Sequence, residues 1–161
     1  MHLYTSYFYQ IRYFKPYMIP FSAAVVDPPW FHDFKDSKHN FIDKNGVLNG
    51  LRMKNFIPHS DFADICLGNQ SCLTGNPRSC PYMTAYENQL RQLTKKKVED
   101  YFESVCNQAI EKMGEELLPV PVLIVEWGPE NVCSRGHTIC TVMTEIGIPT
   151  SELKYPISAN Y

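Results

Sequence analysis

The sequence lacks the features that mark a membrane protein, a secreted protein or a strongly basic protein that coats nucleic acid. Its 161 residues include no run approaching the roughly 20 apolar residues that a membrane-spanning helix needs. The N-terminus has no basic start followed by a long apolar stretch, so no signal peptide is expected. The net charge of −2 argues against a surface that is basic throughout, although it leaves room for a local basic face. We therefore expect a soluble, cytoplasmic protein with no membrane partner.

Paired cysteine spacings are also absent. The chain contains six cysteines, but no two of them form a CxxC pair. Because no signal peptide is expected, reduced thiols are favoured over a framework of disulfides. A zinc or iron–sulfur site would require Cys66, Cys72 and Cys80 to converge with Cys133 or a histidine, and their spacing does not require this. The sequence thus predicts no metal site, names no cofactor and leaves the oligomeric state open.

The composition that is present is that of an ordinary globular protein. Hydrophobic residues make up 44% of the chain and charged residues 20%. The length suits one domain with a sizeable core. The last third of the chain alternates helix, strand and helix, which favours a compact α/β sheet. We expect residues 1–161 to form a single α/β domain, Rossmann-like, with a mostly parallel sheet and flanking helices.

Hydrophobic periodicity and turn residues predict the individual elements. Aromatic and apolar stretches predict strands over residues 3–11, 21–26, 55–58, 61–67 and from 120 onward. Apolar residues at helical spacing predict helices over residues 84–93, 98–118 and 138–147. Thr84 and Glu87 have the spacing of a capping box, and Gly147 is expected to end the last helix. The prolines between residues 12 and 20 predict a loop there.

The segment from Val120 to His137 is the most informative part of the chain. Its apolar strand ends on Glu126. The chain then passes through a Gly-Pro turn and continues to Cys133 and Arg135, just before the last predicted helix. Loops at the carboxyl ends of parallel strands lie beside the free N–H groups of helix starts, where α/β proteins bind ligands. Asp27 also follows a predicted strand, so we expect it to face the same crevice as Glu126. The sequence therefore predicts a ligand site at this edge.

Each side chain of the predicted site has a functional and a structural interpretation. Glu126 is a candidate general acid or base, or the partner of Arg135; otherwise it is a surface carboxylate at a strand end. The guanidinium fork of Arg135 suits the oxygens of a phosphate or carboxylate, and its alternative is a structural salt bridge to Glu126 or Glu130. His137 is a candidate proton shuttle or ligand, with a surface or capping residue as the alternative. Asp27 is a candidate ligand-binding residue or the start of a proline turn.

Cys133 is a candidate nucleophile because Arg135, two residues later, would lower the pKa of its thiol. The alternative is a small buried apolar residue. A phosphatase loop would place arginine six positions after the cysteine, where this chain has Ile139. A sulfurtransferase loop would place the cysteine directly after the strand, whereas six residues intervene here. Covalent catalysis is therefore the weaker interpretation of Cys133.

The chain resembles the family of unknown function numbered 488, which comprises small bacterial and phage α/β proteins. The resemblance extends loosely over nearly the whole chain through five segments: Leu3-Tyr4-Thr5-Ser6-Tyr7, Val25-Val26-Asp27-Pro28-Pro29, Ile65-Cys66-Leu67-Gly68-Asn69, the helix around Tyr101 to Met113, and Leu123-Ile124-Val125-Glu126 with Cys133-Ser134-Arg135. The last segment is the most specific and resembles a family signature "LlCaE…CHR". This chain departs from the family pattern at Pro28, Pro29, Asn69 and Ser134. The resemblance implies a Rossmann-like sheet and a role related to nucleotides or nucleic acids.

These observations favour one function and leave two alternatives. The favoured function is an anion-binding protein that holds a nucleotide or nucleic-acid phosphate at the Glu126–Cys133–Arg135 loop. The first alternative is an enzyme that acts on a nucleotide, base or glycosidic bond with Glu126 as acid or base. The second is a non-enzymatic interaction or inhibitor protein of phage or bacterial origin, which would use the aromatic N-terminal segment and the loop from Phe31 to Gly50.

Overall fold

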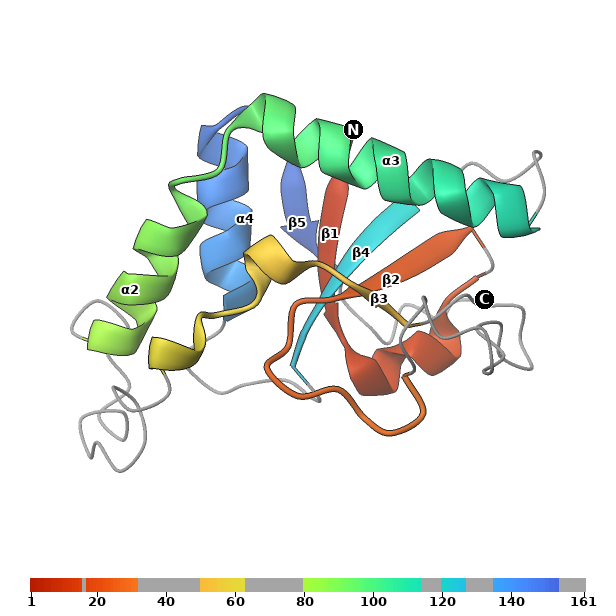
Figure 1. The fold of residues 1–161 in the computed structure, drawn as a ribbon, viewed down its shortest axis with the longest axis horizontal. Helices are drawn as coiled ribbons and strands as arrows, with labels where there is room; N and C mark the ends of the chain where they lie inside the picture. Colours follow the sequence, from red (N-terminus) through yellow and green to blue (C-terminus); the bar gives the residue numbers. More distant parts are fainter. Residues whose placement is uncertain (16, 32–49, 63–79, 114–119, 127–134, 154–161) are drawn as a thin grey trace.

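A parallel sheet of five strands forms the centre of the molecule (Figure 1). The computed structural model describes residues 1–15, 17–31, 50–62, 80–113, 120–126 and 135–153. The strands are β1 (Leu3–Tyr7), β2 (Met18–Ser22), β3 (Leu51–Arg52), β4 (Val120–Glu126) and β5 (Thr150–Glu152). They lie in the order β3-β2-β4-β1-β5, and every pair is parallel. The predicted α/β fold with a parallel sheet and flanking helices is confirmed, whereas the strand order does not confirm its Rossmann-like detail.

The three α-helices of the described residues pack against one face of this sheet. They are α2 (Pro81–Leu90), α3 (Lys95–Met113) and α4 (Arg135–Glu145). Successive strand residues point to opposite faces, so Phe21 and Leu123 belong to the helix-covered face. The buried ring of Phe102 meets Phe21 edge-on, with ring centroids 5.2 Å apart, and lies 5.9 Å from the ring of Phe56. One continuous core thus joins the helices to the inner strands.

The opposite face of the sheet is covered by a short 3-10 helix, η1 (Phe8–Tyr13), and by part of the loop that follows β2. A 3-10 helix has three residues per turn, so Phe8, Ile11 and the following Phe14 share one side. These three side chains are buried against Val122 and Ile124 of β4. The loop contributes Ala24 and Phe31 to the same cluster. η1 begins directly after β1, at the carboxyl end of that strand (Figure 1), and Phe14 after it packs in one cluster with Met18, the first residue of β2.

Several predicted boundaries are wrong. β2 begins at Met18 and ends at Ser22, whereas the prolines led us to expect a loop up to residue 20. The predicted first strand ends at Tyr7, because residues 8–13 turn into η1 and bury their apolar side. The strands expected over 55–58 and 61–67 are replaced, where described, by the 3-10 helices η2 (Lys54–Phe56) and η3 (Ser60–Phe62).

The first of the predicted helices begins earlier than the capping box suggested. α2 starts at Pro81, and Thr84 lies inside the helix, where its hydroxyl donates to the carbonyl of Cys80 at 3.1 Å. Proline is favoured in the first turn because its missing N–H has no partner to lose there. None of the helices in the described part of the chain combines the length and apolar character needed to cross a membrane.

Candidate functional site

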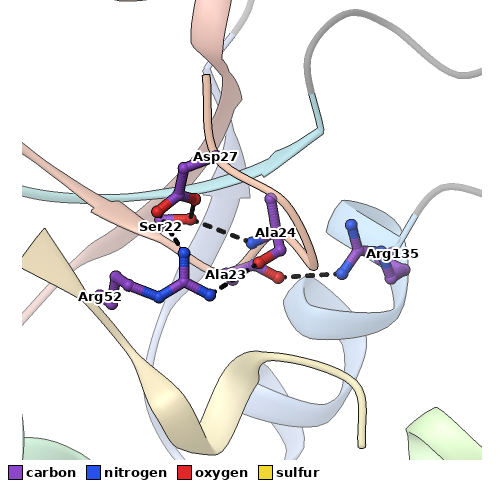
Figure 2. A network of polar contacts seen from close by, with 6 residues as sticks. All are labelled: Ser22, Ala23, Ala24, Asp27, Arg52 and Arg135. Carbon is purple, nitrogen blue, oxygen red and sulfur yellow. Dashed lines mark hydrogen bonds and ion pairs between the residues drawn. The ribbon is translucent and has the colours of Figure 1, made fainter. Parts of the chain in front are cut away.

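The carboxyl ends of β2 and β4 and the start of α4 meet at one edge of the sheet. β2 and β4 are neighbours whose register runs from Met18 opposite Val120 to Ser22 opposite Ile124. Because the two strands are parallel, the loop after Ser22 and the end of β4 at Glu126 leave the sheet on the same side. Figure 2 shows the polar contacts that join the loop after β2 to Arg52 and to the first residue of α4. We call this region, with Ser22–Asp27, Arg52 and Arg135, the β2–β4 edge.

Arg135 fixes the start of α4 to both strands. Its side chain is buried, and its Nη1 donates a hydrogen bond of 2.9 Å to the carbonyl oxygen of Ala23 (Figure 2). Its Nη2 donates to the carbonyl oxygen of Val125, and its guanidinium carbon lies 5.8 Å from the ring centroid of Tyr86. Hydrogen bonds from a charged donor are stronger than those between neutral groups. The first residue of α4 therefore joins β2, β4 and α2 through its side chain.

Asp27 lies at the same edge and orients a second arginine. One carboxylate oxygen accepts a hydrogen bond from the Ser22 hydroxyl, and the other is paired with Nη1 of Arg52 (Figure 2). The Arg52 Nη2 donates to the carbonyl of Ala24 at 3.4 Å. The side chain of Asp27 is 12% exposed, whereas that of Arg52 is 37% exposed. Asp27 thus orients the guanidinium of Arg52, which is partly exposed at the surface.

The remaining predicted residues are placed only in part. The backbone of Glu126 pairs with Tyr7 at the end of β4. Its side chain and the whole of Cys133 lie outside the described residues. His137 is exposed in the first turn of α4, and its carbonyl accepts a hydrogen bond of 3.1 Å from the Thr141 hydroxyl. The structure therefore brings Asp27 and Arg135 to one edge with the end of β4, while the predicted crevice with the Glu126 side chain lies outside the described residues.

Arg52, Ser22 and Tyr86 were missed by sequence reasoning. Arg52 belongs to a strand of two residues, which is too short to give a periodic signal. The sequence predicts Ser22 inside a strand that continues to Val26, and such a strand does not bring Ser22 beside Asp27. Tyr86 was correctly assigned to a helix, but its contact with Arg135 connects positions far apart in the chain. Such a contact leaves no local pattern in the sequence.

The described cysteines do not suggest catalysis. Cys80, Cys106 and Cys140 are free thiols, and burial raises the pKa of Cys106 to about 11. Burial also raises the pKa of Cys140; the Thr5 hydroxyl lowers it and Glu152 raises it further. Thiols with raised pKa values are poor nucleophiles near neutral pH. No group of three or more His, Cys, Asp or Glu side chains converges as a metal site would within the ranges that the structure describes.

Comparison with family models, with curated proteins and with solved structures finds no match to this chain. The resemblance to the family numbered 488 remains an expectation from the sequence. The functional argument consequently depends on the β2–β4 edge itself.

Proposed function

We propose that the protein binds the phosphate of a nucleotide or nucleic acid at the β2–β4 edge. The observation that carries this proposal is the pair of guanidinium groups on either side of the loop after β2. Arg135 donates to the carbonyl of Ala23, and Arg52 donates to the carbonyl of the next residue, Ala24 (Figure 2). Among the charged side chains described at this edge, these two cations accompany one carboxylate, that of Asp27.

The two arginines have different tasks in this proposal. Arg135 is 5% exposed and uses its side chain to hold the N-terminus of α4 in place. The backbone N–H groups at that helix start, with the positive end of the helix dipole, favour an anion. Arg52 is partly exposed, and its guanidinium has five N–H groups; those that remain besides its contacts with Asp27 and Ala24 would donate to phosphate oxygens. In this proposal Arg52 contacts the phosphate, a role that the sequence suggested for Arg135, and Arg135 positions the helix N-terminus.

Isothermal titration of ATP into wild-type protein and Arg52 variants tests the proposal. Arg52→Ala removes a charge-assisted hydrogen bond worth roughly 1.5–3 kcal/mol, so the dissociation constant should rise about ten- to a hundred-fold. Arg52→Lys should recover part of the affinity, because a point charge cannot reproduce the fork.

A matched control is Arg91→Ala. Arg91 is also an exposed arginine in ion pairs, with Glu87 and Glu145, but Glu145 is the last residue of α4, at the opposite helix end from Arg135. This variant should bind ATP as the wild type does. Equal affinities of wild type and folded Arg52→Ala, or equal losses in both alanine variants, would contradict a phosphate site at the β2–β4 edge.

A further inference from the structure

The outward side of η1 presents two tyrosines and an arginine. Its inward residues are buried in the core, which leaves Tyr9 and Tyr13 exposed at 40% and 41%. The guanidinium carbon of Arg12 lies 5.5 Å from the ring centroid of Tyr9 and 5.3 Å from that of Tyr13. The Arg12 Nε also donates a hydrogen bond of 2.8 Å to the carbonyl of Tyr9. The cation and both rings are therefore held together on one surface.

Trp30 extends this surface from the loop after β2. Its side chain is 47% exposed, and its ring meets Phe8 edge-on at 6.0 Å between centroids. It also meets Phe31 edge-on at 6.2 Å. Phe8 is the first residue of η1, so Trp30 lies near the start of this helix. We call Tyr9, Arg12, Tyr13 and Trp30 the aromatic surface.

The charge of the surrounding chain suits a polyanion. Residues 1–15 contain Arg12 and Lys15 but no aspartate or glutamate. In the described part of residues 17–31 the acidic side chain is Asp27, which is paired with Arg52. Residues 1–31, which carry the aromatic surface, thus contain the two cations Arg12 and Lys15 against the one anion Asp27, although the net charge of the whole chain is −2.

We propose that the ligand of this protein is single-stranded nucleic acid, whose bases stack on the aromatic surface. This inference rests on the proposed phosphate site. The start of η1, directly after β1, and the loop that carries Trp30, after Asp27, lie at the same end of the sheet as that site. Aromatic rings interleaved with arginine are the combination that binds unpaired bases and their backbone together. A duplex hides the faces of its bases and needs a wide basic surface, which the acidic net charge argues against.

Fluorescence anisotropy with labelled oligothymidylate of about ten nucleotides, within the usual site sizes, tests the inference. The same length of abasic strand keeps the phosphates and removes the bases, and a duplex of that length removes the exposed base faces. Wild-type protein should bind the oligothymidylate more tightly than either probe. Tyr13→Leu and Trp30→Ala should each weaken oligothymidylate binding about five- to a hundred-fold, the loss expected for one stacked base. Neither variant should change the affinity for the abasic strand.

Two controls separate stacking from damage to the fold. Tyr13→Phe keeps the ring and should retain nearly all of the affinity. Tyr101→Ala removes a tyrosine that is 37% exposed on α3, in the helix layer, and should bind as the wild type does. Circular dichroism checks that each variant is folded.

The outcomes distinguish this inference from the phosphate site. Binding of oligothymidylate that Arg52→Ala weakens but Tyr13→Leu and Trp30→Ala do not would overturn stacking and leave the phosphate site. Binding that the aromatic variants weaken but Arg52→Ala does not would support stacking and overturn the position of the phosphate. If wild-type protein binds ATP but none of these probes, the inference of single-stranded nucleic acid is wrong and the phosphate site remains. If it binds neither ATP nor the probes, both proposals are wrong, and a protein partner becomes the better interpretation of the aromatic surface.

Discussion

At the scale of single residues, the buried guanidinium of Arg135 connects α4 with β4, α2 and the loop after β2. A buried charge is costly unless it is hydrogen-bonded, and Arg135 donates to the carbonyls of Ala23 and Val125 and lies over the ring of Tyr86. The Tyr86 hydroxyl in turn donates to the carbonyl of Phe56 at 2.5 Å. The position of the α4 N-terminus therefore depends on a chain of polar contacts that begins at one side chain.

We predict that Arg135→Ala lowers the free energy of unfolding by about 3 kcal/mol, since each hydrogen bond from a charged donor contributes roughly 1.5–3 kcal/mol. The variant leaves two carbonyl oxygens at the β2–β4 edge without their donors. Arg135→Lys should recover part of the loss, because one ammonium group cannot reach both carbonyls in the geometry of the fork. Urea denaturation followed by circular dichroism measures both values.

The control for this prediction is again Arg91→Ala. Because Arg91 lies at the surface, its removal should leave the free energy of unfolding almost unchanged. An Arg135→Ala variant as stable as the wild type would show that these hydrogen bonds do not hold α4 in place.

At the scale of elements, Gly147 is a local sequence signal that ends α4. The N–H of Ile148 donates to the carbonyl of Met143 at 2.9 Å, and the N–H of Gly147 donates to that of Thr144 at 3.1 Å. This is the hydrogen-bond pattern of a Schellman motif, which requires a left-handed residue at its centre. Gly147 has φ of +97°, as its predicted role as the helix stop requires.

We predict that Gly147→Ala lowers the free energy of unfolding by about 1–2 kcal/mol, the cost of a side chain at positive φ. The cost comes from the backbone, because the nearest atom to an added Cβ is the Lys95 Cδ at 3.4 Å, an ordinary contact. Gly147→Asn should cost less, since asparagine tolerates this conformation better. Thermal unfolding measures the change.

Thr144→Ala is the control, because Thr144 is exposed on the same helix with helical backbone. It should not destabilise the protein, since alanine is the better helix former. Equal stability of Gly147→Ala and wild type would mean that the chain can end α4 in another way.

Elements with a strong local pattern in the sequence could be predicted. Elements that are defined only by hydrogen bonding to a distant strand could not. The buried run of β4, the amphipathic α3 and the Gly147 stop all follow from the sequence. β3 has two residues and is defined by its pairing with Phe21 and Ser22. At the site, the strand-end topology predicted the positions of Asp27 and Arg135, but not that Arg135 donates to the main chain.

Pro20 lies inside β2, although the prolines predict a loop up to this residue. The strand register explains how the proline is accommodated. Ala23 donates to β4 and the carbonyl of Ser22 accepts from Met53, beside β3. Backbone groups in a strand alternate in direction, so Pro20 directs its nitrogen toward the β3 side. The β3 ladder begins one position later, at Phe21 opposite Leu51, so the missing N–H of Pro20 loses no partner in it. A proline is thus accommodated in an inner strand.

At the scale of the whole molecule, the two faces of the sheet are covered differently. The described α-helices share a core on one face, whereas η1 and the loop after β2 cover part of the other. The helix layer provides the larger group of buried apolar side chains. The carboxyl ends of β2 and β4 carry the β2–β4 edge, and the aromatic surface belongs to η1 and the loop after β2. This division predicts that stability depends most on the helix-covered face and ligand binding on the strand ends.

We predict that Phe102→Ala lowers the free energy of unfolding by about 3–5 kcal/mol, because Phe102 is fully buried between Phe21 and Phe56 and its removal leaves a cavity. Tyr101→Ala, at the neighbouring exposed position of α3, should change that free energy by no more than about 0.5 kcal/mol. Urea denaturation monitored by far-ultraviolet circular dichroism and by tryptophan fluorescence should give coincident single transitions, since the same strand β4 contributes Leu123 to the core under the helices and Val122 to the cluster on the other face, where Trp30 packs. Two separate transitions, or a Phe102→Ala variant as stable as Tyr101→Ala, would contradict a shared core. ATP affinity of the folded Phe102→Ala protein should match that of the wild type, because the cavity lies in the helix-covered core and Arg52 lies at the strand ends.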